Sequence, residues 1–312
     1  MTRTVRARAA GKVNLQLAVG ARGEDGYHPL VSVFQAIGLY ETVTATSRED
    51  GEFTCRIDGA ANLAIAPGSI PLDHTNLAVR AARAVAQRYG VTAGADLHIL
   101  KGVPVAGGMA GGSADAAAAL AACAELWQVG ASRDDLLNLA ADLGADVPFA
   151  LLGHTAVGIG RGDQLSPAMA HGEFHWAFAI DSTGLSTPAV YAELDRQRTE
   201  AGVVEHEPRI DADLMRALMS GDAYTLGQCL SNDLEAAALA LAPHLHTTID
   251  IARDADALGV VVSGSGPTVA ALARSRQHAL AIAAHLTARG VDGPVLTASG
   301  PVPGTAILSP AS

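Results

Sequence analysis

The feature that most constrains the fold is a glycine-rich stretch, PVAGGMAGGSADAAAA, between Pro104 and Ala119. Glycine has no Cβ, so its backbone can adopt positive φ and can approach a ligand closely. The alanine-rich half predicts a helix with Ser113 at its N-cap, and the first turn of a helix leaves N–H groups unpaired at the positive end of the helix dipole. Such a helix start favours a polyphosphate ligand. A flexible loop before a helix is the alternative.

The familiar phosphate-binding motifs do not match this stretch. A P-loop, G-x-x-x-x-G-K-[ST], needs a lysine that does not stand between Gly112 and Ser113. The dinucleotide-binding spacing G-x-G-x-x-G is also missing here. Protein kinases carry H-R-D and D-F-G, and neither tripeptide occurs in the chain. A different class of phosphate chemistry is therefore expected.

Composition bounds the class of protein. The 312 residues can form two domains or one large one, and 49% hydrophobic with 17% charged residues indicates a globular chain. A net charge of −11 argues against nucleic-acid and membrane-surface partners. No apolar run approaches the roughly 20 residues of a membrane span. Three scattered cysteines predict neither disulfides nor a zinc site. We expect a cytoplasmic protein, as a monomer or weak homodimer.

Periodicity predicts an α+β chain. We expect two domains, 1–165 and 166–312, and we expect Pro148 to interrupt regular structure. Asn76 and Gly90 should bound one helix, and Ser132, Asp135 and Gly144 another. The expected strands are 3–9, 12–19, two within 29–46, 95–100, 155–160, 175–180 and 259–264, and the expected helices are 77–89, 113–127, 132–144, 188–198, 211–220, 222–238 and 244–258.

Only two of the 21 basic residues are lysines, Lys12 and Lys101. A lysine ammonium is compact and suits a single phosphate oxygen or a hydroxyl better than the planar guanidinium of arginine does. Lys101 precedes the glycine-rich stretch, and Lys12 lies in an expected strand. For both residues a solvated surface position is the alternative.

Five motifs, AGKVNLQL, DGYH, PVAGGMAGGSADAA, LGADVPF and SGSGPT, follow one another between residues 10 and 268. Together and in this order they resemble the GHMP kinase superfamily. Within it, the chain is most similar to the branch that phosphorylates the 2-hydroxyl of 4-diphosphocytidyl-2-C-methyl-D-erythritol in the non-mevalonate isoprenoid pathway. The resemblance implies a two-domain fold with the active site in the cleft between an ATP-binding domain and a substrate-side domain.

Two alternatives stay open beside this interpretation. One is another GHMP kinase, of the homoserine or mevalonate type, and the other is a nucleotide-binding protein that has lost catalysis. The resemblance assigns Tyr27, His28 and Tyr191 to a clamp around cytidine. Such a clamp would have no purpose around a small acid, which argues against the first alternative. The presence of both Lys12 and Asp146 argues against the second.

The resemblance assigns catalytic roles to Lys12 and Asp146. Asp146 would act as the general base for the hydroxyl proton. Lys12 would keep Asp146 ionised and stabilise charge on the transferred phosphoryl group. Whether Asp146 acts alone on the proton or together with Lys12 stays open, and a turn or N-cap role is the alternative for Asp146. Asn14 would orient the substrate, or it would simply bond to backbone at a strand end.

The resemblance also implies a cytidine clamp. Tyr27 would stack on the cytosine, His28 would hydrogen-bond the base, and Tyr191 would cover its other face. Thr187 matches a substrate-contacting threonine. The alternatives are a hairpin turn with an edge aromatic for Tyr27 and His28, and a helix-face core residue for Tyr191.

ATP, as its magnesium complex, is the implied cofactor. Backbone N–H groups between Gly107 and Ser113 would hold the phosphates, with the Ser113 hydroxyl near them or near Mg²⁺. Asp115 would complement the helix dipole, our preferred interpretation, or lie near Mg²⁺; no protein ligands for the metal are predicted. The predicted ATP-binding residues are Pro104, Val105, Ala106, Gly107, Gly108, Met109, Ala110, Gly111, Gly112 and Ser113.

Overall fold

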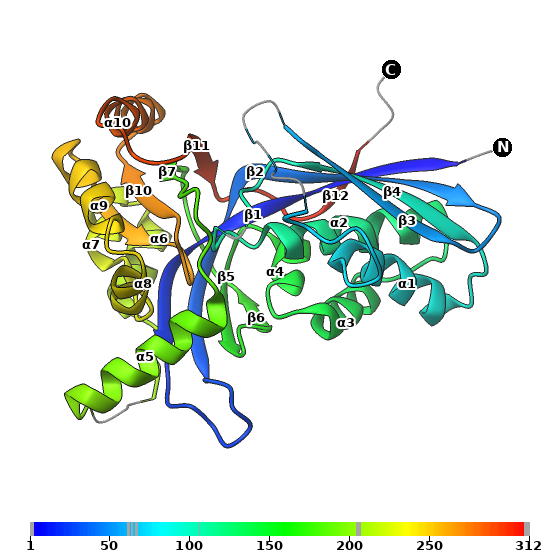
Figure 1. Ribbon diagram of the computed structural model, residues 1–312, viewed down its shortest axis with the longest axis horizontal. Helices are drawn as coiled ribbons and strands as arrows, with labels where there is room; N and C mark the ends of the chain where they lie inside the picture. The colour runs from blue at the N-terminus through cyan, green and yellow to red at the C-terminus, as the bar shows by residue number, and fades with distance from the viewer. Residues whose placement is uncertain are drawn as a thin grey trace.

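The computed structural model describes residues 3–60, 63, 65, 68–105, 107–203 and 207–308. Within them the chain forms two sheets flanked by helices (Figure 1). The larger sheet contains Thr4–Val19 (β1), Leu30–Arg48 (β2), Phe53–Gly59 (β3), Gly94–Lys101 (β4), Thr155–Gly160 (β5), Gln164–Pro167 (β6), Ser231–Asn232 (β8) and Ala306–Leu308 (β12). The smaller sheet contains Phe174–Ala179 (β7), Gly259–Val262 (β9), Val269–Ala273 (β10) and Val295–Gly300 (β11).

The two longest strands of the larger sheet, β1 and β2, form an antiparallel pair that crosses much of the molecule in Figure 1. The sequence predicted two strands in each of these regions, and this was wrong. Register shifts between Ala10 and Gly11 and between Asn14 and Gln16 let each strand continue through the irregularity. The first half of β2 pairs with β5 and its second half with β4, so one strand joins two groups of neighbours.

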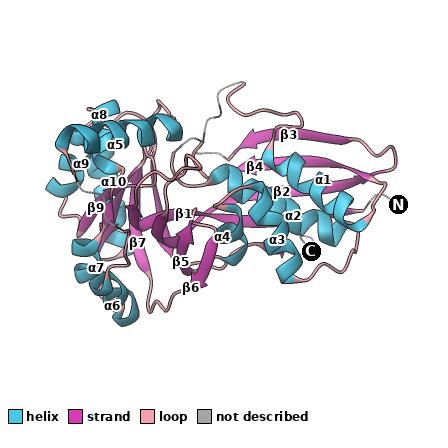
Figure 2. Cartoon of the chain, turned by 90° about the horizontal axis from the view of Figure 1, so that it is seen from below, coloured by secondary structure: helices cyan, strands magenta, loops and turns pink. Residues whose placement is uncertain are grey.

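Four helices cover one face of this sheet, as Figures 1 and 2 show: Leu77–Tyr89 (α1), Gly111–Leu126 (α2), Arg133–Leu143 (α3) and Val147–Leu152 (α4). The predicted caps are confirmed for α1 at Asn76 and Gly90, and for α3 at Ser132 and Asp135, which form a capping box. α2 is almost entirely buried. Its alanines leave room for close packing against both the sheet and α1, which shapes the first core.

Pro148 was expected to interrupt regular structure, and this was wrong. It lies in the first turn of α4, where proline is favoured because the N–H that it lacks would have no partner within the helix. The short helix fixes the direction of the chain immediately after Asp146.

The smaller sheet has the order β11-β7-β10-β9. Helices of the second half of the chain pack around it to form two further cores. These helices are Thr187–Ala201 (α5), Ala212–Ser220 (α6), Ala223–Cys229 (α7), Glu235–Leu241 (α8), Leu245–Asp254 (α9) and Arg276–Ala288 (α10).

The single helix predicted over 222–238 was wrong. Leu230 leaves the helical conformation, and β8 follows as a short strand that pairs in parallel with β1. Asn232 fixes this break, because its side-chain amide donates to the carbonyls of Val262 and Gly264 at 2.7 Å each. Tertiary pairing therefore overrides local helix propensity here.

Near the end of the described chain, β12 pairs with β1 and so returns to the larger sheet. The division of the chain near residue 165 stays a prediction. No helix in the part of the chain that the structure describes has the length and apolar character needed to cross a membrane.

Candidate active site

The glycine-rich segment leads directly into the start of α2. The helix begins at Gly111, so Ser113 lies in its first turn and not at the N-cap as predicted. The N-cap is Ala110, which adopts a left-handed backbone with φ 58° and provides no side-chain cap. Its carbonyl accepts the first helical hydrogen bond, from the Ala114 N–H at 2.9 Å. The N–H groups of the first turn are thus left for a ligand, as anion binding requires.

The position of the segment depends on Gly108. Its φ is +73°, and a Cβ there would lie 2.0 Å from the carbonyl oxygen of Ser263. The Ser263 hydroxyl donates to the Gly108 carbonyl at 3.2 Å, and the Lys12 N–H donates to the Met109 carbonyl at 3.1 Å. The glycine segment is therefore held between β1 and the SGSGPT turn, and only glycine fits at the closest approach.

A cavity of about 490 Å³ opens in front of this segment. Lys12 and Asn14 reach it from β1, Asp146 from the residue before α4, and Thr187 from the start of α5. The structure thus brings together the predicted catalytic residues and the helix start. The predicted loop residues that line the cavity are Pro104, Gly107, Gly108, Ala110, Gly111, Gly112 and Ser113.

Three predicted ATP-binding residues differ from the rest. Val105 does not line the cavity. The side chain of Met109 is buried in the core, so only its backbone faces the neighbouring strand. Ala106 lies outside the described residues. Their part in ATP binding stays a prediction.

Lys12 is buried, so the surface alternative is wrong for this residue. Its ammonium donates to the Asn14 side-chain oxygen, the Asn14 amide donates to the Ser32 hydroxyl at 2.8 Å, and Ser32 donates to the Gln16 carbonyl at 3.0 Å. Burial lowers the pKa of Lys12, while the charge of Asp146 acts in the opposite direction. This chain of hydrogen bonds orients the ammonium, and it shows that Asn14 bonds to side chains.

Asp146 stands at the N-cap position of α4, but its side chain makes no capping hydrogen bond. The carboxylate lines the cavity, so the capping alternative finds no support in the geometry. Its charge also reaches Tyr191, where burial first and Asp146 second raise the pKa of the phenol to about 12.

A second cavity, of about 640 Å³, adjoins the first. Leu30, Ala145, Arg161, Thr187 and Tyr191 line both cavities, so the two lie on either side of these residues. The Thr187 hydroxyl lies 2.8 Å from that of Ser265 in the SGSGPT turn. A ligand extending from the helix start could therefore continue past α5 into the second cavity.

Tyr27 and His28 line the second cavity from the loop between β1 and β2. The loop is closed by the Gly20 N–H, which donates to the Pro29 carbonyl at 2.8 Å. Tyr27 is 55% exposed, and the guanidinium of Arg161 lies 3.7 Å from its ring centroid. Arg161 also donates to Asp25 at 3.2 Å. One face of the Tyr27 ring is thus covered by a cation.

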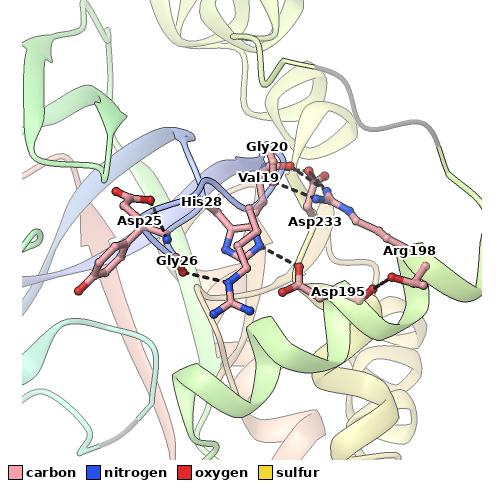
Figure 3. Close-up of polar contacts among 11 residues, drawn as sticks. Val19, Gly20, Asp25, Gly26, His28, Asp195, Arg198 and Asp233 are labelled. Atoms are coloured by element: carbon pink, nitrogen blue, oxygen red, sulfur yellow. Dashed lines mark hydrogen bonds and ion pairs between the residues drawn. The ribbon is translucent and has the colours of Figure 1, made fainter.

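His28 is buried, and its Nε2 lies 2.8 Å from Oδ1 of Asp195 on α5 (Figure 3). The Tyr191 ring packs 5.1 Å from the imidazole, centroid to centroid. The structure therefore brings Tyr191 to His28, and no ring contact joins Tyr27 and Tyr191 among the described residues. A base held between the two tyrosines stays a prediction.

Sequence reasoning missed several residues of the site, namely Ser32, Arg161, Asp195 and Ser265. Asp195 had a signal, because it follows Thr187 and Tyr191 at successive spacings of four on one helix and so shares their face. The sequence contains no such signal for Arg161 and Ser32, because their place in the site depends on the pairing of β2 with β5, two strands that lie far apart in the chain.

Lys101 was expected to meet a phosphate oxygen or solvent, and both expectations were wrong. It is 2% exposed, and its ammonium lies 2.6 Å from Glu41 and 2.6 Å from Asp115. Asp115 therefore pairs with the buried Lys101. It does not serve to complement the helix dipole or to bind an ion in the cavity. Burial is the main cause that raises the pKa of Glu41 to about 8 and that of Asp115 to about 6. The described His, Cys, Asp and Glu side chains include no group of three that could hold a metal ion.

Comparison with known proteins agrees with this geometry. The model of the GHMP kinases N terminal domain matches residues 76–154, and that of the GHMP kinases C terminal domain matches residues 214–292. A 4-diphosphocytidyl-2-C-methyl-D-erythritol kinase of Thermobifida fusca is 51% identical over 308 residues, 98% of each chain. The chain belongs to the GHMP kinases. The cavity at the start of α2 thus lies in a kinase fold, and ATP use follows from the family.

Solved structures of two different kinases resemble this chain in fold. A crystal structure of 4-(cytidine 5'-diphospho)-2C-methyl-D-erythritol kinase matches this GHMP kinase with a TM-score of 0.75 at 29% identity, covering 96% of this chain and 98% of the other. A homoserine kinase of Cytophaga hutchinsonii matches with a TM-score of 0.74 at 18% identity, covering 98% and 97%. The second likeness shows the fold alone.

Proposed function

We propose that the protein transfers the γ-phosphoryl group of ATP to the 2-hydroxyl of 4-diphosphocytidyl-2-C-methyl-D-erythritol, giving the 2-phosphate and ADP in the non-mevalonate isoprenoid pathway. The observation that carries this proposal is that the two cavities adjoin and share five lining residues. One end holds Lys12, Asp146 and the uncapped start of α2, and the other end holds Tyr27 and His28. A polyol joined to a base through a diphosphate has the length and chemistry to occupy both.

In the proposed reaction the substrate hydroxyl oxygen bonds to the γ-phosphorus while the bond from that phosphorus to the β–γ bridging oxygen breaks. The hydroxyl proton goes to the carboxylate of Asp146, and ADP leaves with the bridging oxygen. Lys12 faces the same space, and its ammonium stabilises charge that develops on the transferred group. Asn14 orients that ammonium through the hydrogen bond between them.

ATP fits the helix start on the evidence of the backbone. Gly108 cannot carry a Cβ, and the first turn of α2 has no side-chain cap, so N–H groups are available to phosphate oxygens. Mg²⁺ would enter bound to ATP and neutralise phosphate charge while keeping several of its own waters, which requires no cage of carboxylates. The Ser113 hydroxyl, which lines the cavity, is the side chain that we assign to the phosphates or the metal.

Base recognition is assigned to the second cavity. Tyr27 stacks on the cytosine, His28 hydrogen-bonds it, and Tyr191 and Thr187 complete the wall. Arg161 lies where the two cavities meet, so its guanidinium is available to the diphosphate that joins base and polyol. The proposal also includes a cytoplasmic location and no nucleic-acid or membrane partner, which follow from the sequence, and a monomer or weak homodimer.

The test is coupled ADP release by the purified protein with Mg-ATP and four acceptors: the cytidylated polyol, the same polyol without cytidine, homoserine and mevalonate. We expect turnover with the cytidylated compound alone. Turnover with homoserine or mevalonate would keep the kinase and remove the base-binding assignment. No turnover with any acceptor would favour the catalytically silent alternative.

A matched variant tests the assigned base. Asp146→Asn keeps the size of the side chain but cannot accept the proton, so kcat should fall about 10³-fold, within the usual contribution of a general base. ATP affinity, measured by equilibrium binding, should change little, because the phosphates are held by backbone groups of the glycine segment. Near-normal turnover would remove Asp146 from the proposed mechanism.

A further inference from the structure

The contact between His28 and Asp195 joins two elements that are 167 residues apart in the chain. His28 comes from the loop before β2 and Asp195 from α5 (Figure 3). The side chains are 6% and 30% exposed, so the contact is shielded from solvent on the histidine side. An ionised carboxylate has no hydrogen to donate, which means that the proton between the two groups lies on Nε2 of His28.

The second ring nitrogen of His28, Nδ1, makes no hydrogen bond to any residue that the structure describes. In a neutral imidazole with a proton on Nε2, Nδ1 carries a lone pair and can only accept. Because His28 lines the second cavity and Nε2 is already engaged, Nδ1 is the ring atom left for a ligand there. In that tautomer the histidine offers one hydrogen-bond acceptor.

The helix α5 holds the imidazole from two positions. Tyr191 packs against the ring at 5.1 Å, and Asp195, one turn further along the same helix face, accepts from Nε2. A half-turn of the ring would replace Nε2 by Cε1 beside Asp195 and so would break the second contact. The backbone at Asp195 is itself tied down, since the Thr199 hydroxyl donates to the Asp195 carbonyl at 2.8 Å (Figure 3).

We propose that Asp195 is a positioning residue that selects cytosine over uracil by fixing the protonation of His28. With Nδ1 held as an acceptor, His28 accepts a hydrogen bond from the exocyclic amino group of cytosine. Uracil carries a carbonyl oxygen at that ring position, so two lone pairs would face each other. This inference rests on the proposed function, because it assumes that the second cavity receives the base.

The first experiment needs no variant of Asp195. The full-length protein is labelled with ¹⁵N-histidine, and the ring-nitrogen signals of His28 are identified among the 11 histidines by their loss in His28→Gln. We expect a protonated Nε2 and an unprotonated Nδ1. A proton on Nδ1, or on both nitrogens, would overturn the proposal, whether or not any substrate is turned over.

The second experiment compares kcat/KM for the cytidylated polyol and for its uridylated analogue. In Asp195→Ala the preference for the cytidylated compound should fall about tenfold, chiefly through a higher KM, as expected when one buried hydrogen bond is lost. Asp195→Glu, which restores an acceptor, should recover part of the preference. An unchanged preference in Asp195→Ala would contradict the proposal.

Asp58→Ala is the matched control. It removes the carboxylate that lies 2.7 Å from Nε2 of His98, a histidine that lines neither cavity, and it should leave the preference unchanged. A wild-type protein inactive on the cytidylated compound would count against the proposed function. The ring-nitrogen spectrum would still decide the state of His28. The same spectrum decides the matter if Asp195→Ala does not fold.

Discussion

The two lysines of the chain lie against the same glycine-rich segment and are both buried, yet their surroundings differ. Lys101 is enclosed by two carboxyl groups at 2.6 Å each, whereas Lys12 has a neutral amide as its direct partner and faces a cavity. The pKa of Lys12 is lowered, chiefly by burial, while Asp115 and Glu41 raise that of Lys101 against the effect of burial.

This difference separates a charge kept for a ligand from a charge used by the fold. Burying an ammonium without an ion-pair partner is unfavourable, so Lys12 is explained by what enters the cavity, whose phosphates would complete its environment. Lys101 is already compensated and has nothing left to offer a ligand. A Cβ on Gly111 would lie 2.9 Å from the side-chain oxygen of Glu41, so this carboxyl group packs directly against the start of α2.

The largest expected effect belongs to Lys12. Lys12→Met keeps the length of the side chain and removes the charge, so kcat should fall about 10³-fold because developing phosphoryl charge loses its partner. The free energy of unfolding should not decrease, since an unpaired buried charge is replaced by an apolar group. Steady-state kinetics and urea unfolding of the same preparation check both statements. A large loss of stability would mean that Lys12, like Lys101, stabilises the fold.

The next effect concerns Lys101. Lys101→Met leaves the buried carboxyl groups of Glu41 and Asp115 without their cation, and the free energy of unfolding should fall by about 3 kcal/mol. The double variant Lys101→Met with Asp115→Asn serves as the control, because it removes one of the stranded charges and should recover part of the loss. Unfolding midpoints in urea measure the effect, and a stable single variant would mean that the ion pairs contribute little.

A smaller effect is expected in the second cavity. Tyr27→Ala should raise the KM for the cytidylated substrate about tenfold, since stacking of a base on an aromatic ring contributes about 1–3 kcal/mol. The KM for ATP should hardly change, because Tyr27 lines only the second cavity. Tyr27→Phe, which keeps the ring, is the control. Equal changes in both KM values would mean that the base does not bind at Tyr27.

The last prediction is a pH dependence. The folded-state pKa of Glu41 is about 8, above its ordinary value of 4.5, so the folded chain holds a proton that the unfolded chain releases. This stabilisation is complete below about pH 4.5 and is lost as the pH rises through about 8. Glu41→Gln has no titrating group at this position, so its stability relative to the wild type should rise steadily as the pH increases from 5 to 9. Urea unfolding at several pH values tests this, and parallel curves would contradict it.

Much of the local structure could be predicted because its causes are local. The cap of α1 at Asn76 and the capping box of α3 at Ser132 and Asp135 depend on groups two or three residues apart, and both were confirmed. The helix after the glycines was also foreseen, but its first residue was not. Ala110 adopts a left-handed backbone conformation that its residue type does not predict. As a result, α2 begins at Gly111, two residues before the predicted start.

The sequence alone determined the order of the motifs, the residue types within them and the presence of a glycine-rich segment before a helix, because these features are local. The tertiary structure decided which polar groups meet. Only the pairing of distant strands buries Lys101 between Glu41 and Asp115, and only the packing of α5 brings Asp195 to His28. Burial and long-range contact set the charge and hydrogen-bonding state of these groups, and neither can be read from residue order.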